Sequence, residues 1–138
     1  MSEGKVLVID DDEHVRTLVK MALLRGGYEV VEAENGAKGM QSLLSGDNPS
    51  TITVIVCDIH MPEVNGSEAI AYFRSHFPSL PIIIMTGQPD YRYAAQMLRQ
   101  GVVDYLVKPI QPHILVDAVR RAVSQHAHGK ALRENVMP

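Results

Sequence analysis

The sequence predicts an α/β protein that has a parallel sheet with helices on both of its faces. Short apolar runs that suit buried strands alternate with stretches whose apolar residues recur at helical spacing, and this βα unit occurs five times along the 138 residues. Four of the apolar runs end in a polar residue, namely Asp10, Asp58, Thr86 and Lys108. Ligands bind open α/β sheets outside the carboxyl ends of the strands, so these endings mark the candidate functional edge.

The predicted strands are short apolar runs, several of them flanked by glycine or polar residues that break regular structure. Pro81 stands near the start of the fourth strand, where a missing backbone N–H is tolerated. The strands are predicted at residues 5–9, 28–33, 53–57, 80–85 and 104–107.

The predicted helices lie between and after these strands. Asp12 and Asp90 are placed to cap the first and fourth helices, and Pro112 suits the first turn of the last. Glycines end several helices, and residues 47–51 are expected to form a polar loop. The side chains expected to face the core are Val15, Leu18, Val19, Ala22 and Leu23, then Ala37, Met40, Leu43 and Leu44, then Ile70, Phe73 and Phe77, then Ala94, Ala95 and Leu98, and finally Leu115, Ala118, Val119, Ala122 and Val123.

The composition indicates one globular domain. Hydrophobic residues make up 46% and charged residues 21% of the chain, and its net charge is −3 without a basic block. This balance argues against nucleic-acid and membrane-surface binding. The single cysteine, Cys57, lies within an apolar strand and is expected to be a small buried hydrophobic residue. Neither a signal peptide nor a transmembrane run is apparent, so we expect a cytoplasmic location.

The acidic residues after the first and third strands suit a divalent cation. Asp10, Asp11 and Asp58 would lie together if those strands are neighbours, and three uncompensated carboxylates repel one another. Mg²⁺ prefers oxygen ligands and keeps several waters, which leaves room for a phosphate. Thr86 offers a hydroxyl donor and Lys108 an ammonium, and both suit the oxygens of a phosphoryl group. A carboxylate in such a site can attack phosphorus and become an acyl phosphate.

Four segments in combination carry a family resemblance. They are Val-Ile-Asp-Asp-Asp-Glu at residues 8–13, Asp-Ile-His-Met-Pro-Glu-Val-Asn-Gly at 58–66, Met-Thr-Gly at 85–87 and Lys-Pro at 108–109. Over roughly residues 4–125 the chain resembles the receiver domain of two-component response regulators. The resemblance implies a flavodoxin-like, chemotaxis-regulator-like (βα)5 fold, doubly wound, with five parallel strands in the order 2-1-3-4-5. It also implies a receiver domain over residues 1–125. Residues 126–138 are polar and contain glycine, so we expect them to form a flexible C-terminal tail.

The resemblance further implies a phosphoacceptor and a metal site. Asp58 would accept the phosphoryl group. Mg²⁺ would be bound by Asp10, Asp11, Asp58 and the backbone carbonyl of His60.

Other residues would then respond to the phosphoryl group. Thr86 would donate a hydrogen bond to it and Lys108 would pair with it. Tyr105 matches the switch aromatic residue, which turns inward when Thr86 moves. A cis peptide is implied between Lys108 and Pro109, where proline makes the cis form accessible.

The function implied is a phosphorelay switch. A sensor histidine kinase or a histidine phosphotransfer protein would supply the phosphoryl group, and the face made by the fourth helix, the fifth strand and the last helix would change shape. The chain would catalyse only its own phosphorylation and dephosphorylation, not the reaction of an outside substrate. Its output would pass to a downstream protein partner or to an output domain absent from this chain, without direct nucleic-acid or membrane binding.

Three alternatives are weighed against this interpretation. In a haloacid-dehalogenase-like phosphatase Asp10 and Asp12 would form the paired acids, but His14 stands where threonine or valine is expected and no acidic pair follows Lys108. A flavin-binding module needs a phosphate-binding loop after the first strand, where this chain has carboxylates. The receiver could also be a module of a larger multidomain regulator or hybrid kinase, and the sequence leaves that open.

Overall fold

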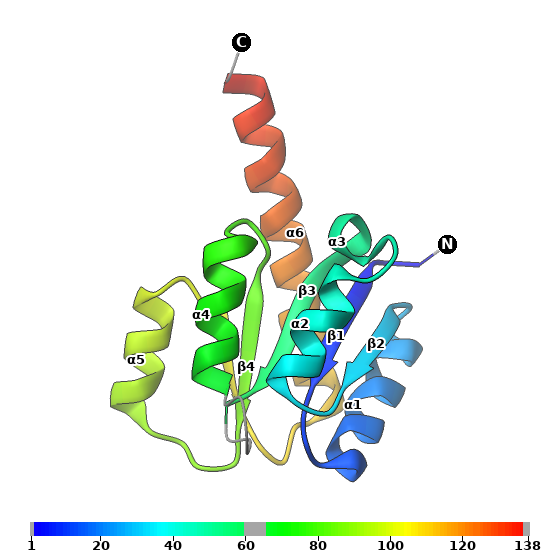
Figure 1. The fold of residues 1–138 in the computed structure, drawn as a ribbon, viewed down its shortest axis with the longest axis vertical. Helices are drawn as coiled ribbons and strands as arrows, with labels where there is room; N and C mark the ends of the chain where they lie inside the picture. Colours follow the sequence, from blue (N-terminus) through cyan, green and yellow to red (C-terminus); the bar gives the residue numbers. More distant parts are fainter. Residues whose placement is uncertain (1, 60–65, 137–138) are drawn as a thin grey trace.

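The sheet is the middle layer of a three-layer α/β structure (Figure 1). The computed structural model describes residues 2–59 and 66–136. Its five strands are parallel and stand in the order β2-β1-β3-β4-β5, which confirms the predicted fold class and strand order. The strands are β1 (Lys5–Ile9), β2 (Glu29–Ala33), β3 (Ile52–Asp58), β4 (Ile82–Thr86) and β5 (Asp104–Val107).

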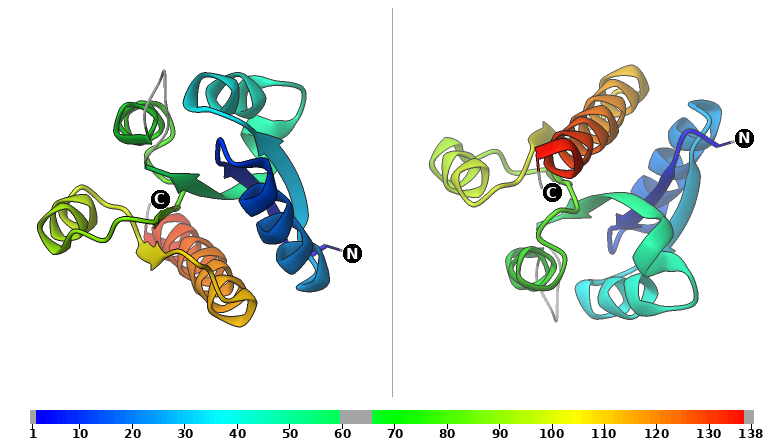
Figure 2. Two further views of the ribbon diagram at one scale, coloured as in Figure 1. Left: turned by 90° about the horizontal axis from the view of Figure 1, so that it is seen from below. Right: turned by 90° about the horizontal axis from the view of Figure 1, so that it is seen from above.

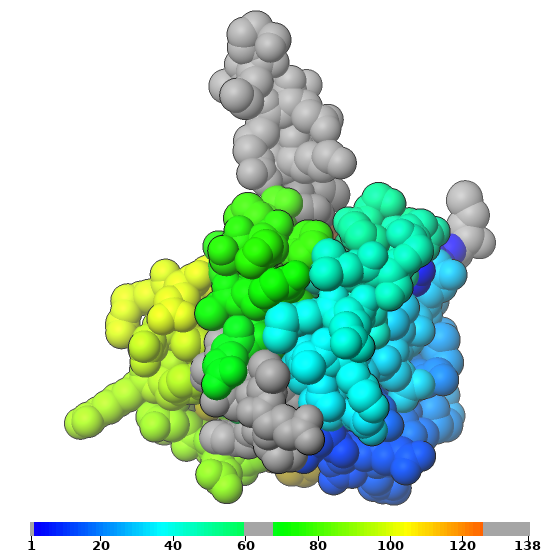
Figure 3. All heavy atoms as spheres, in the orientation of Figure 1, coloured from blue at the N-terminus to red at the C-terminus, as the bar shows by residue number. Residues whose placement is uncertain are grey.

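The helices cover both faces of this sheet (Figure 2). Helices α1 and α6 lie on one face and α2 and α4 on the other, while α5 lies beside β5. In Figure 3 α2 and α4 are seen side by side over their face. The helices are α1 (Glu13–Arg25), α2 (Gly36–Leu44), α3 (Asn48–Thr51), α4 (Gly66–His76), α5 (Tyr91–Arg99) and α6 (Pro112–Val136).

The central strands consist mainly of apolar residues, as expected for strands whose two faces are both covered. Along β1 the side chains alternate, so that Val6 and Val8 pack under α1 and α6 while Leu7 and Ile9 pack under α2 and α4. Strand β4 is likewise buried at every position. This double burial explains why these strands show uninterrupted apolar runs in the sequence rather than the alternation of a half-exposed sheet.

Two helix starts agree with their predicted capping residues. The Asp12 carboxylate accepts the N–H groups of His14 and Val15, and the Asp90 carboxylate accepts those of Arg92 and Tyr93. These caps fix where the chain leaves β1 and β4 and turns back along the sheet.

The predicted polar loop at residues 47–51 is wrong, because Asn48–Thr51 form the short helix α3. Pro49 stands in its first turn, where a missing N–H costs nothing. The hydroxyl groups of Ser50 and Thr51 both donate to the Asp47 carbonyl and hold the turn together. The backbone N–H groups of Ser50 and Thr51 also donate to this carbonyl, so the turn closes through local bonds and needs no apolar stripe.

The predicted apolar stripes are too wide. Leu18, Leu44 and Leu98 were expected to face the core, yet their side chains are about half exposed, at 56%, 55% and 49%. Ala95 is exposed as well. Each of the three leucines directly neighbours a buried residue, so each helix buries a narrower strip than its apolar residues suggest.

Helix α6 continues past the predicted domain end. We placed the boundary at residue 125, whereas the helical backbone runs to Val136 and its last turns project beyond the body of the molecule (Figure 1). The boundary and the flexibility of residues 126–138 stay predictions.

Close packing of α2 on β1 depends on Gly39. A Cβ atom added there would lie 3.0 Å from Cγ1 of the fully buried Ile9, and closer still to its Cδ1. We expect Gly39→Ala to lower the free energy of unfolding by about 1 kcal/mol, since an overpacking cost of about 1–3 kcal/mol exceeds the gain in helix propensity. Urea denaturation measures the change. Adding Ile9→Val, which removes Cδ1, should make the double variant less unstable than the sum of the two single changes, and strict additivity would contradict the clash.

Candidate functional site

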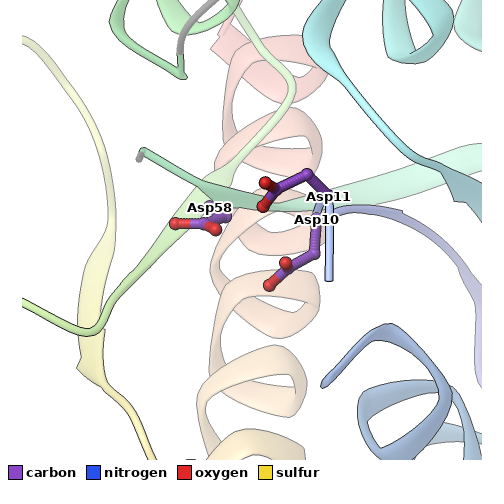
Figure 4. A group of neighbouring side chains, drawn as sticks. All are labelled: Asp10, Asp11 and Asp58. Carbon is purple, nitrogen blue, oxygen red and sulfur yellow. The ribbon is translucent and has the colours of Figure 1, made fainter. Parts of the chain in front are cut away.

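Neighbouring strands bring three carboxylates to one edge of the sheet. Ile9 of β1 is paired with Cys57 of β3, so Asp10 and Asp58 leave the sheet side by side. Figure 4 shows the carboxylates of Asp10 and Asp11 directed toward Asp58. One carboxylate oxygen from each residue lies within 4.8 Å of the others. The structure therefore brings together the three acidic side chains that the sequence proposed as a group.

The three carboxylates differ in their access to solvent. The Asp10 and Asp58 residues are only 0% and 3% exposed, whereas Asp11 is exposed. The Oδ1 atom of Asp10 accepts the backbone N–H of Asp12 at 2.9 Å, so its side chain is fixed by the turn that follows it. The cluster is thus closed around Asp10 and open to solvent at Asp11.

Lys108 supplies the positive charge of the site. Its Nζ donates a hydrogen bond to Oδ2 of Asp58 at 3.0 Å and lies 2.8 Å from Oδ2 of Asp10. Burial alone would lower the pKa of Lys108, but the close contacts and charges of the two carboxylates outweigh it and raise that pKa above its ordinary value. Lys108 therefore remains an ammonium group in the folded protein.

The surroundings of Asp10 shift the pKa of its carboxyl group. Burial and the charge of Asp58 raise the pKa of its carboxyl group, although Lys108 and the N–H of Asp12 oppose the shift. Within residues 2–59 and 66–136 its Oδ2 atom meets the Lys108 ammonium, but no donor there has hydrogen-bond geometry toward it. This buried oxygen consequently keeps the capacity to bind a cation.

Neutralising Asp10 should stabilise the metal-free protein. A carboxyl group with a raised pKa keeps its proton in the folded state at a pH where the unfolded chain has lost it, so folding becomes less favourable as pH rises from about 3.9 to the raised value. We expect Asp10→Asn to raise the thermal midpoint at neutral pH without Mg²⁺ and to reduce the loss of stability across that window. Asp12→Asn, on an exposed capping residue, is the control. An unchanged or lower midpoint for Asp10→Asn would contradict the assignment.

The two expected switch residues both hold the segment between β4 and α5. Thr86 is fully buried at the end of β4, and its hydroxyl accepts the N–H of Gln88 at 3.0 Å and donates to the Gln88 carbonyl at 3.2 Å. The Tyr105 ring packs partly buried against the core, and its hydroxyl accepts the N–H of Asp90 at 3.3 Å. Movement of either side chain would break its hydrogen bonds to this segment. The contact of Tyr105 with Asp90 could not be inferred from the sequence.

Three smaller expectations have different outcomes. Cys57 is fully buried, and burial raises the pKa of its thiol, so it behaves as the small hydrophobic residue that was predicted. The peptide between Lys108 and Pro109 is cis, as the resemblance implied. His60, whose carbonyl was expected to bind the metal, lies outside the described residues.

Sequence reasoning missed Arg16. Its guanidinium donates to the backbone carbonyl of Asp10 at 2.8 Å and lies 3.3 Å from the Glu32 carboxylate. The available signal was weak, namely a basic residue one helical turn after the Asp12 cap.

A groove of about 810 Å³ lies beside the site between α1 and α6. Leu18 and Met21 of α1 and Val116 of α6 line it, and Lys108 and Pro109 form part of the same wall. Leu18, which was predicted to face the core, therefore lies on an exposed surface that continues to Lys108 at the functional edge.

A parallel sheet with buried carboxylates and a contacting lysine at the carboxyl ends of its strands is the arrangement expected of a receiver domain. Comparison with known families assigns it: the response regulator receiver domain model matches residues 6–120. The chain belongs to this family, which favours the receiver interpretation over the phosphatase and flavin-binding alternatives.

Individual relatives agree with the assignment. The chain is 36% identical over 126 residues to the DNA-binding transcriptional regulator NtrC of Escherichia coli, covering 91% of this chain and 26% of that protein. It is 32% identical over 127 residues to the response regulator protein FleR of Pseudomonas aeruginosa, covering 92% of this chain and 25% of that one. The chain thus spans about a quarter of the length of these curated relatives.

Solved structures share the fold. A response regulator receiver domain protein from Clostridium thermocellum superposes with a TM-score of 0.82 at 29% identity, over 88% of this chain and 95% of that one. NtrX from Brucella abortus has a TM-score of 0.88 at 21% identity over 100% of this chain and 31% of that one, which shows a common fold. In the described part of the chain, none of the helices combines the length and apolar character needed to span a bilayer.

Proposed function

We propose that the chain is a Mg²⁺-dependent phosphoaspartate switch in which Asp58 accepts the phosphoryl group. One observation carries the proposal: a nearly buried carboxylate ends the central strand β3, hydrogen-bonded to Lys108 and flanked by Asp10 and Asp11. This arrangement offers one nucleophile, one fixed cation and two further oxygen ligands at a single edge of the sheet.

The transfer would exchange one bond to phosphorus for another. A carboxylate oxygen of Asp58 attacks the phosphorus of a phosphohistidine, the P–N bond breaks, and its electron pair leaves with the imidazole, which takes up a proton. The product is an aspartyl phosphate, a mixed anhydride. The switch is reset by hydrolysis, in which water attacks the same phosphorus and releases inorganic phosphate and the Asp58 carboxylate. Lys108 pairs with the phosphoryl oxygens in both steps.

The residues present suit Mg²⁺. The donor set is made of carboxylate oxygens, Asp10 Oδ2 is buried without an aligned donor among the described residues, and Asp11 faces solvent, where coordinated waters can be kept. Asp10, Asp11, Asp58 and the His60 carbonyl would hold the ion. When bound it supplies positive charge that offsets the negative charge of the carboxylates and of the phosphoryl oxygens.

The switch would act through the segment between β4 and α5. A phosphoryl group on Asp58 adds about −1.5 to −2 charge and three acceptor oxygens, which compete with Gln88 for the hydroxyl of Thr86. Tyr105 would then turn inward and give up its bond to Asp90. The face that changes is formed by α5, β5 and α6, where Tyr91 is 90% exposed.

The partners follow from the same chemistry. The donor would be a sensor histidine kinase or a histidine phosphotransfer protein acting in the cytoplasm, and the groove between α1 and α6 offers it an apolar surface that continues to Lys108. The output would be a downstream protein or an output domain outside this chain, and the relatives of greater length are compatible with the second arrangement. Neither nucleic acid nor membrane would be contacted directly.

Intact-mass measurement tests the proposal. The full chain is incubated with acetyl phosphate and Mg²⁺, and a parallel sample contains a chelator in place of the metal. We expect one phosphoryl adduct that forms only with Mg²⁺ and is lost on treatment with hydroxylamine, which cleaves acyl phosphates. An adduct that resists hydroxylamine, or that forms equally well with the chelator, would contradict the proposal.

A further inference from the structure

Asp10 makes contacts through its N–H, its carbonyl and both of its carboxylate oxygens. The contact to the carbonyl comes from a positively charged side chain. The N–H of Asp10 donates to the Ala33 carbonyl at 3.1 Å, its Oδ1 accepts the Asp12 N–H, and its Oδ2 meets Lys108. Its carbonyl accepts Nη1 of Arg16 at 2.8 Å. A guanidinium therefore fixes the main chain at the point where the acidic turn begins.

Arg16 is itself fixed by a second contact. Its side chain is only 15% exposed, and its Nε lies 3.3 Å from Oε1 of Glu32 on β2. The other carboxylate oxygen of Glu32 accepts Lys20 at 3.1 Å. The planar fork of Arg16 thus joins two elements at once, the turn after β1 and the edge strand β2, which a lysine cannot do with the same geometry.

We propose that Arg16 is a positioning residue for the cation site. This inference rests on the proposed function, because it concerns the Mg²⁺ affinity of the same carboxylates. Arg16 would act on the ligands through the main chain, because it holds the carbonyl of Asp10, which is part of the peptide bond to the adjoining Asp11. Removing groups that orient metal ligands in this way commonly lowers metal affinity by about 10–100-fold.

Removing Arg16 produces two opposite effects, so the sign of the change is diagnostic. Loss of a positive charge near an acidic cluster strengthens the attraction for Mg²⁺. Loss of the hydrogen bond to the Asp10 carbonyl loosens the turn and weakens binding. If Arg16 acts only through its charge, its removal should tighten Mg²⁺ binding. If Arg16 positions the ligands, its removal should weaken Mg²⁺ binding.

Isothermal titration of the full chain with Mg²⁺, without any phosphoryl donor, tests the inference. We expect Arg16→Met to weaken Mg²⁺ binding about tenfold. Arg16→Lys keeps the charge but not the fork and should also bind more weakly than the wild type. Lys20→Met is the matched control, since Lys20 shares helix α1, the charge and the partner Glu32 but is not bonded to Asp10. Its affinity should be unchanged or slightly tighter.

All titrations are made well below the thermal midpoint of each variant, which separates positioning from general loss of structure. Because Arg16→Lys keeps the charge, weaker binding by that variant reports the lost fork and not a lost charge. Arg16→Met binding as tightly as Lys20→Met, with a wild type that binds Mg²⁺, would overturn the inference alone. A wild type that does not bind Mg²⁺ would overturn the proposed function as well.

Discussion

Asp58→Asn is expected to take up no phosphoryl group from acetyl phosphate under conditions in which the wild type is fully modified. The substituted amide would keep the shape of the side chain but lack a nucleophilic carboxylate oxygen, so incorporation should fall to background rather than by a modest factor. We do not expect the neighbouring acid Asp10 to replace it, because Asp10 is completely buried and its Oδ1 is held by the N–H of Asp12. Intact mass, followed over time, measures the loss.

Asp47→Asn is the control for this experiment. Asp47 is a carboxylate whose side chain is 75% exposed, remote in sequence from the strand ends, and its removal should leave phosphorylation unchanged. Continued modification of Asp58→Asn at the wild-type rate would show that another residue is the acceptor.

Lys108→Met is expected to lower the free energy of unfolding by about 3 kcal/mol in metal-free, mildly alkaline buffer, because removing one partner of a buried ion pair leaves uncompensated charge. The carboxylates of Asp10 and Asp58 are almost completely buried, and the Lys108 ammonium contacts both. Urea denaturation measures the effect. Lys38→Met, which breaks the exposed pair with Glu34, is the control and should leave the stability close to that of the wild type.

The pH dependence of Lys108→Met has a definite sign. The Lys108 ammonium beside Oδ2 lowers the pKa of Asp10, so its removal leaves burial less opposed and that pKa rises further. The folded variant then binds more protons than the unfolded chain over a wider range, and its stability falls as pH rises through that range. The deficit relative to the wild type should therefore shrink on acidification, and added Mg²⁺ should restore part of it. A deficit that grows on acidification would contradict the assigned role.

The sheet could be predicted from sequence because its physical causes are local. Strands buried on both faces are largely apolar, so the polar residues that end or follow them, Asp58, Thr86 and Lys108, stand out in the sequence. The strand order came from the resemblance, and only the order places β1 beside β3 and so brings Asp10 to Asp58.

What the sequence did not reveal depends on contacts between distant elements. Whether Leu18 is buried depends on how closely α6 approaches α1, and the two helices leave a groove there. The bond from the Asp90 N–H to Tyr105 joins residues on different elements. Arg16 looks like any basic residue on a helix until β2 brings Glu32 beside it.

Locating the phosphoryl group is the most direct test of the proposed switch. The chain is phosphorylated with acetyl phosphate and Mg²⁺, reduced with borohydride, which converts an aspartyl phosphate to homoserine, and mapped by peptide mass spectrometry. We expect homoserine at position 58 alone, and none when Mg²⁺ is withheld. Homoserine at position 10 or 11, or no conversion at any position while the donor remains intact, would contradict the assignment of Asp58 as the phosphoacceptor.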